Sequence, residues 1–332
     1  MSLRRGLVSL TTAVALLLPT AAYGTGEGDP TATPQPYVGI DGLAHLPAPA
    51  VVYGSDGNEF GGLDLDIACN HGGKIAHQAK ALEKVVRLIR ASGRRVIWTI
   101  GPNKTNVMVD QLPTDLPHGR CDATGIEQQN AVLDGIDDPS YLPIRAPLAK
   151  DKRQMYWRTD PHWTTVAATV FAVRVARELS ARLAKRQHYT YGTETRVGLF
   201  TKLLGQDTPE TVPTALPATP VTVRTTPDSA ADYAGYPDLV WDHSWDSSPA
   251  KRTWGGHTLL LGDSFTLAAL DSLRPLFRHG RWLWVNGVPV QSLLDGIVDA
   301  HTVVLEVQQN FLYLDQPVLT RSFRAQLRKA LG

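Results

Sequence analysis

Two short segments of this chain hold side chains whose types could carry out nucleophilic catalysis. In one of them, Ser264 ends the sequence Gly262-Asp263-Ser264, which directly follows an apolar run. In the other, Asp160 and His162 stand two residues apart. A serine nucleophile needs a base to take its proton, and the base needs an acid that fixes its tautomer. On a turn, the Asp160 carboxylate could bind one imidazole nitrogen of His162 and leave the other free.

The position of Ser264 suits this chemistry because ligands of an open α/β sheet bind beyond the carboxyl ends of its strands. A serine at such a strand-to-helix turn has an exposed hydroxyl. The backbone N–H groups of the helix N-terminus beside it can stabilise an oxyanion. The sequence therefore predicts a reaction centre at the end of the strand that precedes Ser264.

Both segments also have a purely structural interpretation. Asp and Ser are among the best helix N-caps, so Asp263 and Ser264 could serve only to begin a helix. Asp160 could cap the helix that follows it, with Pro161 at the first helical position. That interpretation accounts for Asp160 and leaves His162 unexplained.

A second acid–base pair and a group of aromatic residues stand before Ser264. Asp242 and His243 form a rival pair, ranked below Asp160 and His162 because their stretch is polar and loop-like. The aromatic residues could stack on sugar rings, although Trp and Tyr more often fill cores. They are Tyr233, Tyr236, Trp241, Trp245 and Trp254.

The elements that must hold these residues alternate along the chain. Apolar runs at 96–100, 258–261, 282–285 and 302–305 predict buried strands, and helical spacing of apolar residues recurs over 75–89, 165–183 and 319–331. Gly93 is placed to end the first of these helices. Continuous apolar strands between helices favour an α/β fold, with a mostly parallel sheet covered on both faces. The segment 208–228, rich in Pro and Thr, is expected to be an insertion or long excursion within one catalytic domain over 51–332.

The N-terminus resembles an export signal. Arg4 and Arg5 precede an apolar stretch and then small residues, the order of a secretory signal over 1–24. We expect a flexible tether over 25–50 and a secreted or extracytoplasmic protein, with an uncleaved N-terminal anchor as the alternative. The arginine pair leaves the general and the twin-arginine export routes both open. Because export exposes the chain to an oxidising compartment, we expect its two cysteines, Cys69 and Cys121, to form a disulfide.

Composition excludes several classes of protein. The 332 residues are 43% hydrophobic and 20% charged, which excludes disordered, collagenous and coiled-coil chains. A net charge of +1 shows no basic footprint, so we expect no nucleic-acid partner. No apolar run reaches the roughly 20 residues of a membrane span, so a multi-span protein is excluded. Two cysteines without a clustered pair of histidines do not supply the usual ligands of a metal site, and we expect no metal or other cofactor.

Five motifs in order resemble the SGNH-hydrolase-like family of alginate O-acetyltransferases. The two that carry the chemistry are Asp160-x-His162-Trp163-Thr164 and Gly262-Asp263-Ser264-Phe265. The others are Gly54-Ser55-Asp56-Gly57-Asn58-Glu59-Phe60, Gly101-Pro102-Asn103-Lys104 and Leu112-Pro113. Asp and His precede Ser here as in that family, whereas ordinary SGNH hydrolases place Ser first. The resemblance implies a three-layer SGNH-hydrolase-like fold with this circularly permuted order of motifs.

The resemblance also implies the roles of the residues. Ser264 is the expected nucleophile, His162 the general base and Asp160 its orienting partner. The residues expected to bind substrate are Trp163, Asn103, Lys104, Gln308 and Asn310. The chain departs from the family after Glu306, where Gln308-Gln309-Asn310 replaces a charged Glu-Arg pair, so we expect an acceptor other than alginate.

The sequence therefore predicts an exported O-acetyltransferase. It would move an acetyl group through a serine acyl-enzyme to a hydroxyl of a cell-envelope or secreted glycan. The partners would be that glycan and, as the resemblance implies, a membrane acyltransferase that donates the acetyl group. Two alternatives remain open: a secreted acetyl esterase that uses the same residues, and a non-catalytic glycan-binding or scaffold protein that keeps the fold.

Overall fold

The computed structural model describes residues 50–332 apart from 219–220, 228–241 and 314–315. All of them belong to the unit Ala48–Gly332. The predicted signal over 1–24, and all but the last residue of the predicted tether, lie outside the described residues.

A six-stranded sheet forms the middle layer, in the order β3-β10-β8-β9-β7-β6. Its strands are β3 Arg95–Gly101, β10 Thr302–Gln308, β8 Trp254–Gly262, β9 Phe277–Trp284, β7 Asp242–Ser248 and β6 Thr222–Pro227. The first four strands in this order are parallel to one another. Strand β7 then pairs antiparallel with β9, and β6 pairs antiparallel with β7. The four strands predicted from apolar runs are the parallel ones, which confirms a mostly parallel sheet.

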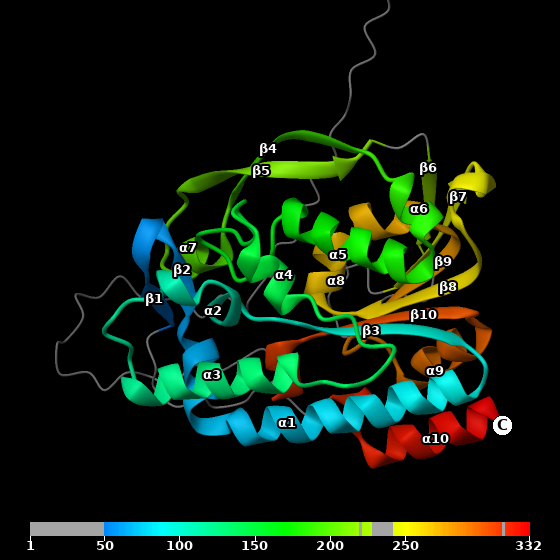
Figure 1. The fold of residues 1–332 in the computed structure, drawn as a ribbon, viewed down its shortest axis with the longest axis horizontal. Helices are drawn as coiled ribbons and strands as arrows, with labels where there is room; N and C mark the ends of the chain where they lie inside the picture. Colours follow the sequence, from blue (N-terminus) through cyan, green and yellow to red (C-terminus); the bar gives the residue numbers. More distant parts are fainter. Residues whose placement is uncertain (1–49, 219–220, 228–241, 314–315) are drawn as a thin grey trace, which may run out of the picture. The chain divides into compact units, whose positions relative to one another are not determined.

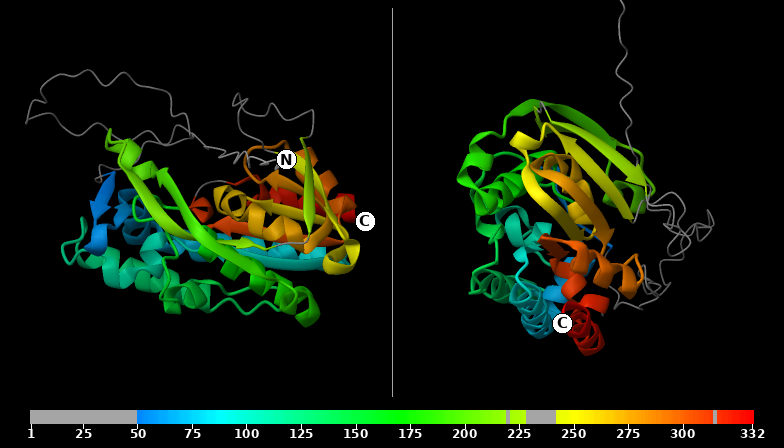
Figure 2. Two further views of the ribbon diagram at one scale, coloured as in Figure 1. Left: turned by 90° about the horizontal axis from the view of Figure 1, so that it is seen from above. Right: turned by 90° about the vertical axis from the view of Figure 1, so that its right-hand side faces the viewer.

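Helices cover both faces of this sheet, so the predicted three layers are confirmed (Figures 1 and 2). One face carries α1 Gly62–Ala91, α3 Arg120–Asp134, α9 Val290–Asp299 and α10 Arg321–Leu331. The other carries α4 Arg145–Lys150, α5 Thr165–Leu179, α6 Ala181–Lys185 and α8 Ser264–Leu273. Two short helices are α2 Lys104–Val107 and α7 Leu199–Leu203. None of the described helices has the length and apolarity needed to cross a membrane.

Two small antiparallel hairpins lie outside the central sheet. One pairs β1 Val51–Tyr53 with β2 Glu59–Gly61, and the other pairs β4 Tyr189–Val197 with β5 Pro209–Pro217. We call the second hairpin, with α7 between its strands, the β4–β5 arm (residues 189–217). The arm passes over α5 in Figure 1 and packs against that helix through β5.

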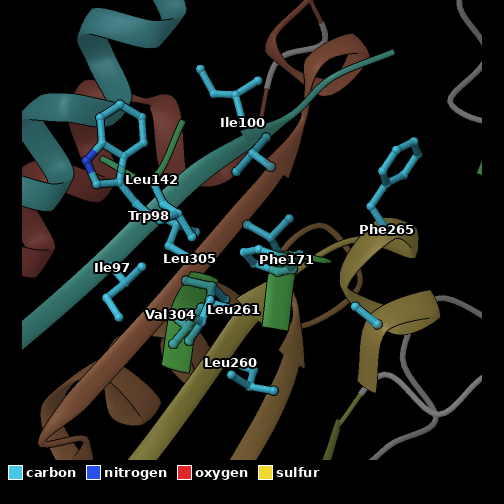
Figure 3. Packing of buried hydrophobic residues seen from close by; sticks show 14 of the residues in the cluster. Ile97, Trp98, Ile100, Leu142, Phe171, Leu260, Leu261, Phe265, Val304 and Leu305 are labelled. Atoms are coloured by element: carbon cyan, nitrogen blue, oxygen red, sulfur yellow. The ribbon is translucent and has the colours of Figure 1, made fainter. Parts of the chain in front are cut away.

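The core lies between the sheet and its two helical layers (Figure 3). Trp98 of β3, Leu261 of β8 and Leu305 of β10 are at most 1% exposed, and Phe171 of α5 and Phe265 of α8 pack with them. Such complete burial explains why apolar residues follow one another in these strands rather than standing only at alternate positions.

Two helices have other bounds than their apolar spacing predicts. Helix α1 begins at Gly62, before Cys69, because its first turns bury Leu65 against a smaller apolar cluster that includes Phe60. The helix predicted over 165–183 is two helices. Ser180 separates them, because its backbone is extended and its hydroxyl accepts the first amides of α6.

The segment 208–228, expected to be an insertion or long excursion, holds strands β5 and β6. Prolines at 209, 213 and 217 fit in β5 because they are separated by even numbers of residues, so their backbone nitrogens face the same side of the strand. Ala215, of the same parity, donates its N–H to the Thr165 hydroxyl and not to β4. Amides of this parity therefore point away from the partner strand, and the prolines cost no hydrogen bond of the ladder.

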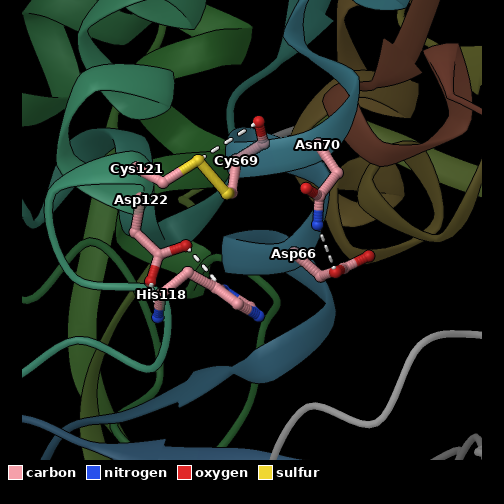
Figure 4. Close-up of a disulfide and its surroundings, with 6 residues drawn as sticks. All are labelled: Asp66, Cys69, Asn70, His118, Cys121 and Asp122. Atoms are coloured by element: carbon pink, nitrogen blue, oxygen red, sulfur yellow. Dashed lines mark hydrogen bonds and ion pairs between the residues drawn. A yellow bond between two sulfur atoms is a disulfide. The ribbon is translucent and has the colours of Figure 1, made fainter.

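The predicted disulfide is present and joins α1 to α3 (Figure 4). Cys69 and Cys121 are 52 residues apart, with their Cα atoms at 4.9 Å. His118 and Asp122 lie beside them at a spacing that a metal ion could use. The Cys69 sulfur is bonded to another sulfur, however, and the His118 ring is bonded to Asp122 at 2.9 Å. This group is therefore an Asp–His pair beside a disulfide.

Candidate active site

Ser264 is the first residue of α8, directly beyond the carboxyl end of β8. Asp263 is the N-cap, and its Oδ1 accepts the Phe265 N–H at 2.9 Å. Gly262 is required at this turn, because a Cβ there would lie 2.0 Å from the Thr266 hydroxyl oxygen. The capping interpretation is thus right for Asp263, and it leaves the half-buried Ser264 side chain with no part in the cap.

The second motif forms a compact loop between α4 and α5, residues 156–163, which we call the His162 loop. Tyr156 and Trp163 pair as an antiparallel bridge at its base, and the Trp157 N–H donates to the His162 carbonyl at 3.2 Å. Asp160 Oδ1 accepts the His162 N–H at 2.8 Å and lies 2.7 Å from His162 Nδ1. A proton on Nδ1 that is donated to Asp160 leaves Nε2 as the basic nitrogen.

The loop is held against the start of α8. Trp163 Nε1 donates to the Phe265 carbonyl at 2.9 Å. The His162 ring lies on the Phe265 ring, with centroids 5.3 Å apart. His162 thus neighbours the residue that follows Ser264. No hydrogen bond joins Ser264 to His162 among the described residues, and such catalytic bonds often form only in the complex with substrate.

Asp160 is a buried carboxylate that its neighbours keep ionised. Burial by itself would raise its pKa. The charge of His162 and the hydrogen bonds from it, together with the charge of Arg196, outweigh burial and lower the pKa of Asp160 well below its usual range. Arg196 Nη2 lies 3.4 Å from Asp160 Oδ1, and its guanidinium stacks on the Trp157 ring at 4.0 Å. Asp160 is therefore a charged partner for an imidazolium at His162.

Asp160 does not cap α5, so that interpretation of the motif is wrong. Thr164 is the N-cap of α5, and its hydroxyl accepts the Ala167 N–H. The second oxygen of Asp160 accepts the Leu199 N–H at 2.9 Å, at the start of α7 in the β4–β5 arm.

Lys104 and Glu210 fix the backbone of the His162 loop from two sides. The Lys104 ammonium donates to the carbonyls of Glu59, Trp157 and Arg158 at 2.5–2.7 Å. Burial lowers the pKa of Lys104 to about 7, although the charges of nearby carboxylates act to raise it.

Glu210 of β5 meets the loop on its other side. It accepts the Arg158 N–H at 2.9 Å and the Thr159 N–H at 3.1 Å. Neither Glu210 nor Arg196 stands out in the sequence, because neither belongs to one of the five motifs.

The residues expected to bind substrate occupy three different environments. Trp163 is 1% exposed and packs on Phe171 and Phe265, and Lys104 is 1% exposed with its ammonium engaged inside the protein. Buried in this way, both support the loop instead of offering a free surface to a substrate. Gln308 ends β10 and Asn310 lies just beyond it, and both are half-buried. Their contacts with substrate stay predictions.

Asn103 stands just beyond the carboxyl end of β3 and is 1% exposed. Its Nδ2 donates to Asn310 Oδ1 at 2.6 Å, and Asn310 Nδ2 donates to Asp64 Oδ1 at 2.5 Å. Burial raises the pKa of Asp64 to about 6. Asn310 thus links Asn103 to Asp64 in a chain of hydrogen bonds.

The rival pair is not arranged as a catalytic dyad. Asp242 forms an ion pair with Arg281, while the His243 ring faces Trp282 with centroids 5.2 Å apart. Burial lowers the pKa of His243 to about 4, and neither ring nitrogen has a hydrogen-bond partner among the described residues.

Two of the aromatic residues before Ser264 are described. Trp245 is buried, and its Nε1 donates to the Arg274 carbonyl. Trp254 starts β8, at the end of the strand opposite to Ser264. These two therefore offer no sugar platform at the site. Tyr233, Tyr236 and Trp241 lie outside the described residues.

Comparison with known proteins agrees with this geometry. The sequence profile of the family described as SGNH hydrolase-like domain, acetyltransferase AlgX matches residues 51–239, which hold the His162 loop and end before Ser264. No curated protein is significantly similar in sequence. Three solved structures are similar in fold at low sequence identity. The O-acetyltransferase domain of Pseudomonas putida AlgJ is 17% identical; the match covers 85% of this chain and 99% of that chain, with a TM-score of 0.50. Bacillus cereus PatB1 is 17% identical; the match covers 75% of this chain and 93% of that chain, with a TM-score of 0.52. A DHHW family protein from Eubacterium siraeum is 14% identical; the match covers 80% of this chain and 96% of that chain, with a TM-score of 0.50.

The match of the profile to more than half of the chain and the shared three-layer fold point the same way. The chain belongs to the family of SGNH hydrolase-like domains of the AlgX acetyltransferase type.

Proposed function

We propose that this protein is an exported O-acetyltransferase that moves an acetyl group through Ser264 to a hydroxyl of a cell-envelope or secreted glycan. The observation that carries the proposal is the Asp160–His162 pair, docked by Trp163 onto the first turn of α8, where Ser264 stands. Membership of an acetyltransferase family supports the choice of acyl group. The disulfide fits a protein that works outside the cytoplasm.

The proposed reaction has two steps. Ser264 Oγ attacks the acetyl carbonyl carbon as its proton moves to His162 Nε2, and the bond to the donor's leaving oxygen breaks as that oxygen takes the proton. A glycan hydroxyl then attacks the acetyl-serine and gives its proton to His162, and His162 passes that proton to Ser264 Oγ as the bond between Oγ and the acetyl group breaks. Of the first three amides of α8, those of Phe265 and Thr266 are bound by Asp263 and Glu306, so the Ser264 N–H would stabilise the oxyanion in both steps, and Asp160 stabilises the imidazolium.

The acetyl donor would be a membrane acyltransferase partner. An acetyl esterase differs only in the second step, in which water would replace the glycan hydroxyl. Purified protein should therefore be incubated with a chromogenic acetyl ester, with and without candidate oligosaccharides. We expect acetylated sugar by mass spectrometry. Ester hydrolysis with no acetylated sugar would favour the esterase.

The role of Ser264 is tested by Ser264→Ala. We expect loss of acetyl-ester turnover by several orders of magnitude, because a triad member is removed, with an unchanged thermal midpoint. The matched control is Ser272→Ala, which removes a hydroxyl from the far end of the same helix. Turnover at the wild-type rate in a folded Ser264→Ala variant would refute the assignment.

A further inference from the structure

Two carboxyl side chains are buried together behind Ser264. Asp263 caps α8 and is 0% exposed, and Glu306 comes from the neighbouring strand β10 and is 1% exposed. The two carboxyl groups are neighbours close enough for each to influence the pKa of the other. Burying two adjacent carboxylates is costly unless their oxygens are hydrogen-bonded or one of the groups is protonated.

Three of the four carboxyl oxygens accept hydrogen bonds from N–H or O–H groups. Asp263 Oδ1 accepts the Phe265 N–H at 2.9 Å, and its Oδ2 accepts the Gln308 N–H at 2.6 Å. Glu306 Oε2 accepts the Thr266 N–H at 3.1 Å and the Thr266 hydroxyl at 2.8 Å. Glu306 Oε1 has no such donor among the described residues.

Glu306 Oε1 is therefore the oxygen that can carry a proton. Gly101 leaves room for it, because a Cβ at that position would lie 2.3 Å from Oε1. A proton on Oε1 can be donated to Asp263, which completes the hydrogen bonds of both groups. The negative charge then stays on Asp263, where the N-terminus of α8 and the nearby His162 favour it.

The electrostatics agree with this geometry. Burial raises the pKa of both groups, that of Asp263 to about 6 and that of Glu306 well above its ordinary value, where the charge of Asp263 adds to the effect. The other titratable groups facing the pair are His162 and Tyr156. Burial raises the pKa of Tyr156 well above its ordinary value, so the phenol stays neutral.

We propose that Asp263 and Glu306 share one proton, carried by Glu306 Oε1, and that this pair positions Ser264 by fixing the first turn of α8. The pair accepts the amides of Phe265 and Thr266 in that turn and binds them to the end of β10 through Gln308. With no proton the two charges would repel each other. With two protons the capping charge at α8 would be lost.

The test compares substitutions that keep or remove the shared proton's hydrogen bond. In Glu306→Gln, the amide N–H₂ donates to Asp263 and the amide oxygen accepts from Thr266, so we expect acetyl-ester turnover within about threefold of wild type with the same pH profile. Glu306→Ala removes the acceptor of the Thr266 N–H and hydroxyl, and it removes the proton donor to Asp263, which keeps its bonds from Phe265 and Gln308. We expect it to lower kcat by about 10²-fold, the loss that a small misplacement of a catalytic group causes.

A second measurement does not depend on turnover. Because the folded pKa of Glu306 is raised, the folded protein keeps a proton that the unfolded chain releases above about pH 4.3. The stabilising contribution of that proton is complete below this pH and falls as pH rises. Wild-type protein should therefore lose stability to urea, relative to Glu306→Gln, as pH rises from about 5 to 8.

The outcomes separate this inference from the proposed function, on which its catalytic part rests. A constant stability difference between wild type and Glu306→Gln across this pH range would overturn the shared proton, whether or not the enzyme is active. A Glu306→Gln variant that is folded but as impaired as Glu306→Ala would overturn it too. If the stability difference between wild type and Glu306→Gln depends on pH but the protein turns over no acetyl ester, the shared proton would be supported and the proposed function refuted.

Discussion

The two carboxylate oxygens of Asp160 accept hydrogen bonds from three N–H groups, and two of these bonds fix the orientation of His162. The three donors are the backbone and ring N–H groups of His162 and the backbone N–H of Leu199. Arg196 adds a positive charge beside the carboxylate. The result is an imidazole held in one orientation with its outer nitrogen free for Ser264.

Asp160→Asn should therefore impair the enzyme strongly. Asparagine has one acceptor oxygen, and its N–H₂ group facing Nδ1 would favour the wrong tautomer of His162. We expect acetyl-ester turnover to fall by about 10⁴-fold, the loss known for the equivalent change in a serine protease. The lost acceptor should lower the free energy of unfolding by about 1–3 kcal/mol. Both quantities should be measured on one preparation.

The chain offers a matched control in Asp122. This buried carboxylate binds the His118 backbone N–H and ring Nδ1, both at 2.9 Å, beside the disulfide (Figure 4). Asp122→Asn breaks an Asp–His pair of the same kind, in α3 on the other helical layer, so it should lower stability with little effect on turnover. Equal losses of turnover in the two variants would mean that Asp160 acts only through the fold.

At the scale of elements, the β4–β5 arm belongs to the active site as much as the central sheet does. It contributes Arg196 from β4, Glu210 from β5 and the Leu199 amide from α7, all in contact with the His162 loop. The sheet positions Ser264, whereas the arm positions the loop that carries its base.

Glu210→Ala tests this division of roles. It leaves the amides of Arg158 and Thr159 without their acceptor, so the loop should shift while α8 stays in place. We expect kcat to fall by about 10²-fold, as for other small misplacements of a catalytic group. Thr195→Ala is the control, because Thr195 is an exposed arm residue that bonds only Thr211. Wild-type turnover in Glu210→Ala would show that the loop keeps its conformation without the arm.

At the scale of the whole molecule, the disulfide stabilises the fold without taking part in the site. Cys69 and Cys121 join α1 to α3, while α8, α5 and the arm lie on the other face of the sheet (Figure 1). Closing a loop of 52 residues constrains the unfolded chain, which the chain-entropy model values at about 4 kcal/mol.

The double variant Cys69→Ser/Cys121→Ser should therefore be less stable by up to about 4 kcal/mol in urea unfolding, with turnover near that of wild type at low temperature. Reduction of the wild-type protein should reproduce the shift of the unfolding midpoint. A stable double variant with low turnover would place the disulfide among the residues that shape the site.

The sequence by itself determines the central sheet and the chemical groups of the site. The parts of β3, β8, β9 and β10 that are buried on both faces hold the apolar runs at 96–100, 258–261, 282–284 and 302–305, so these strands can be recognised from the sequence. The disulfide is predicted because the chain has two cysteines and its N-terminus resembles an export signal. Asp160, His162 and Ser264 are recognisable because so few residue types can serve as acid, base and nucleophile.

Only the tertiary structure decides how these groups are supported. The prolines of β5 obscured a strand, because whether a missing N–H matters depends on which way that amide faces. Lys104 and Trp163 carry polar groups that suggest a substrate contact, yet their partners are carbonyls supplied by other segments, so burial turns them into supports. The proton shared by Asp263 and Glu306 exists only because two strands distant in sequence end side by side, where two buried charges cannot both persist.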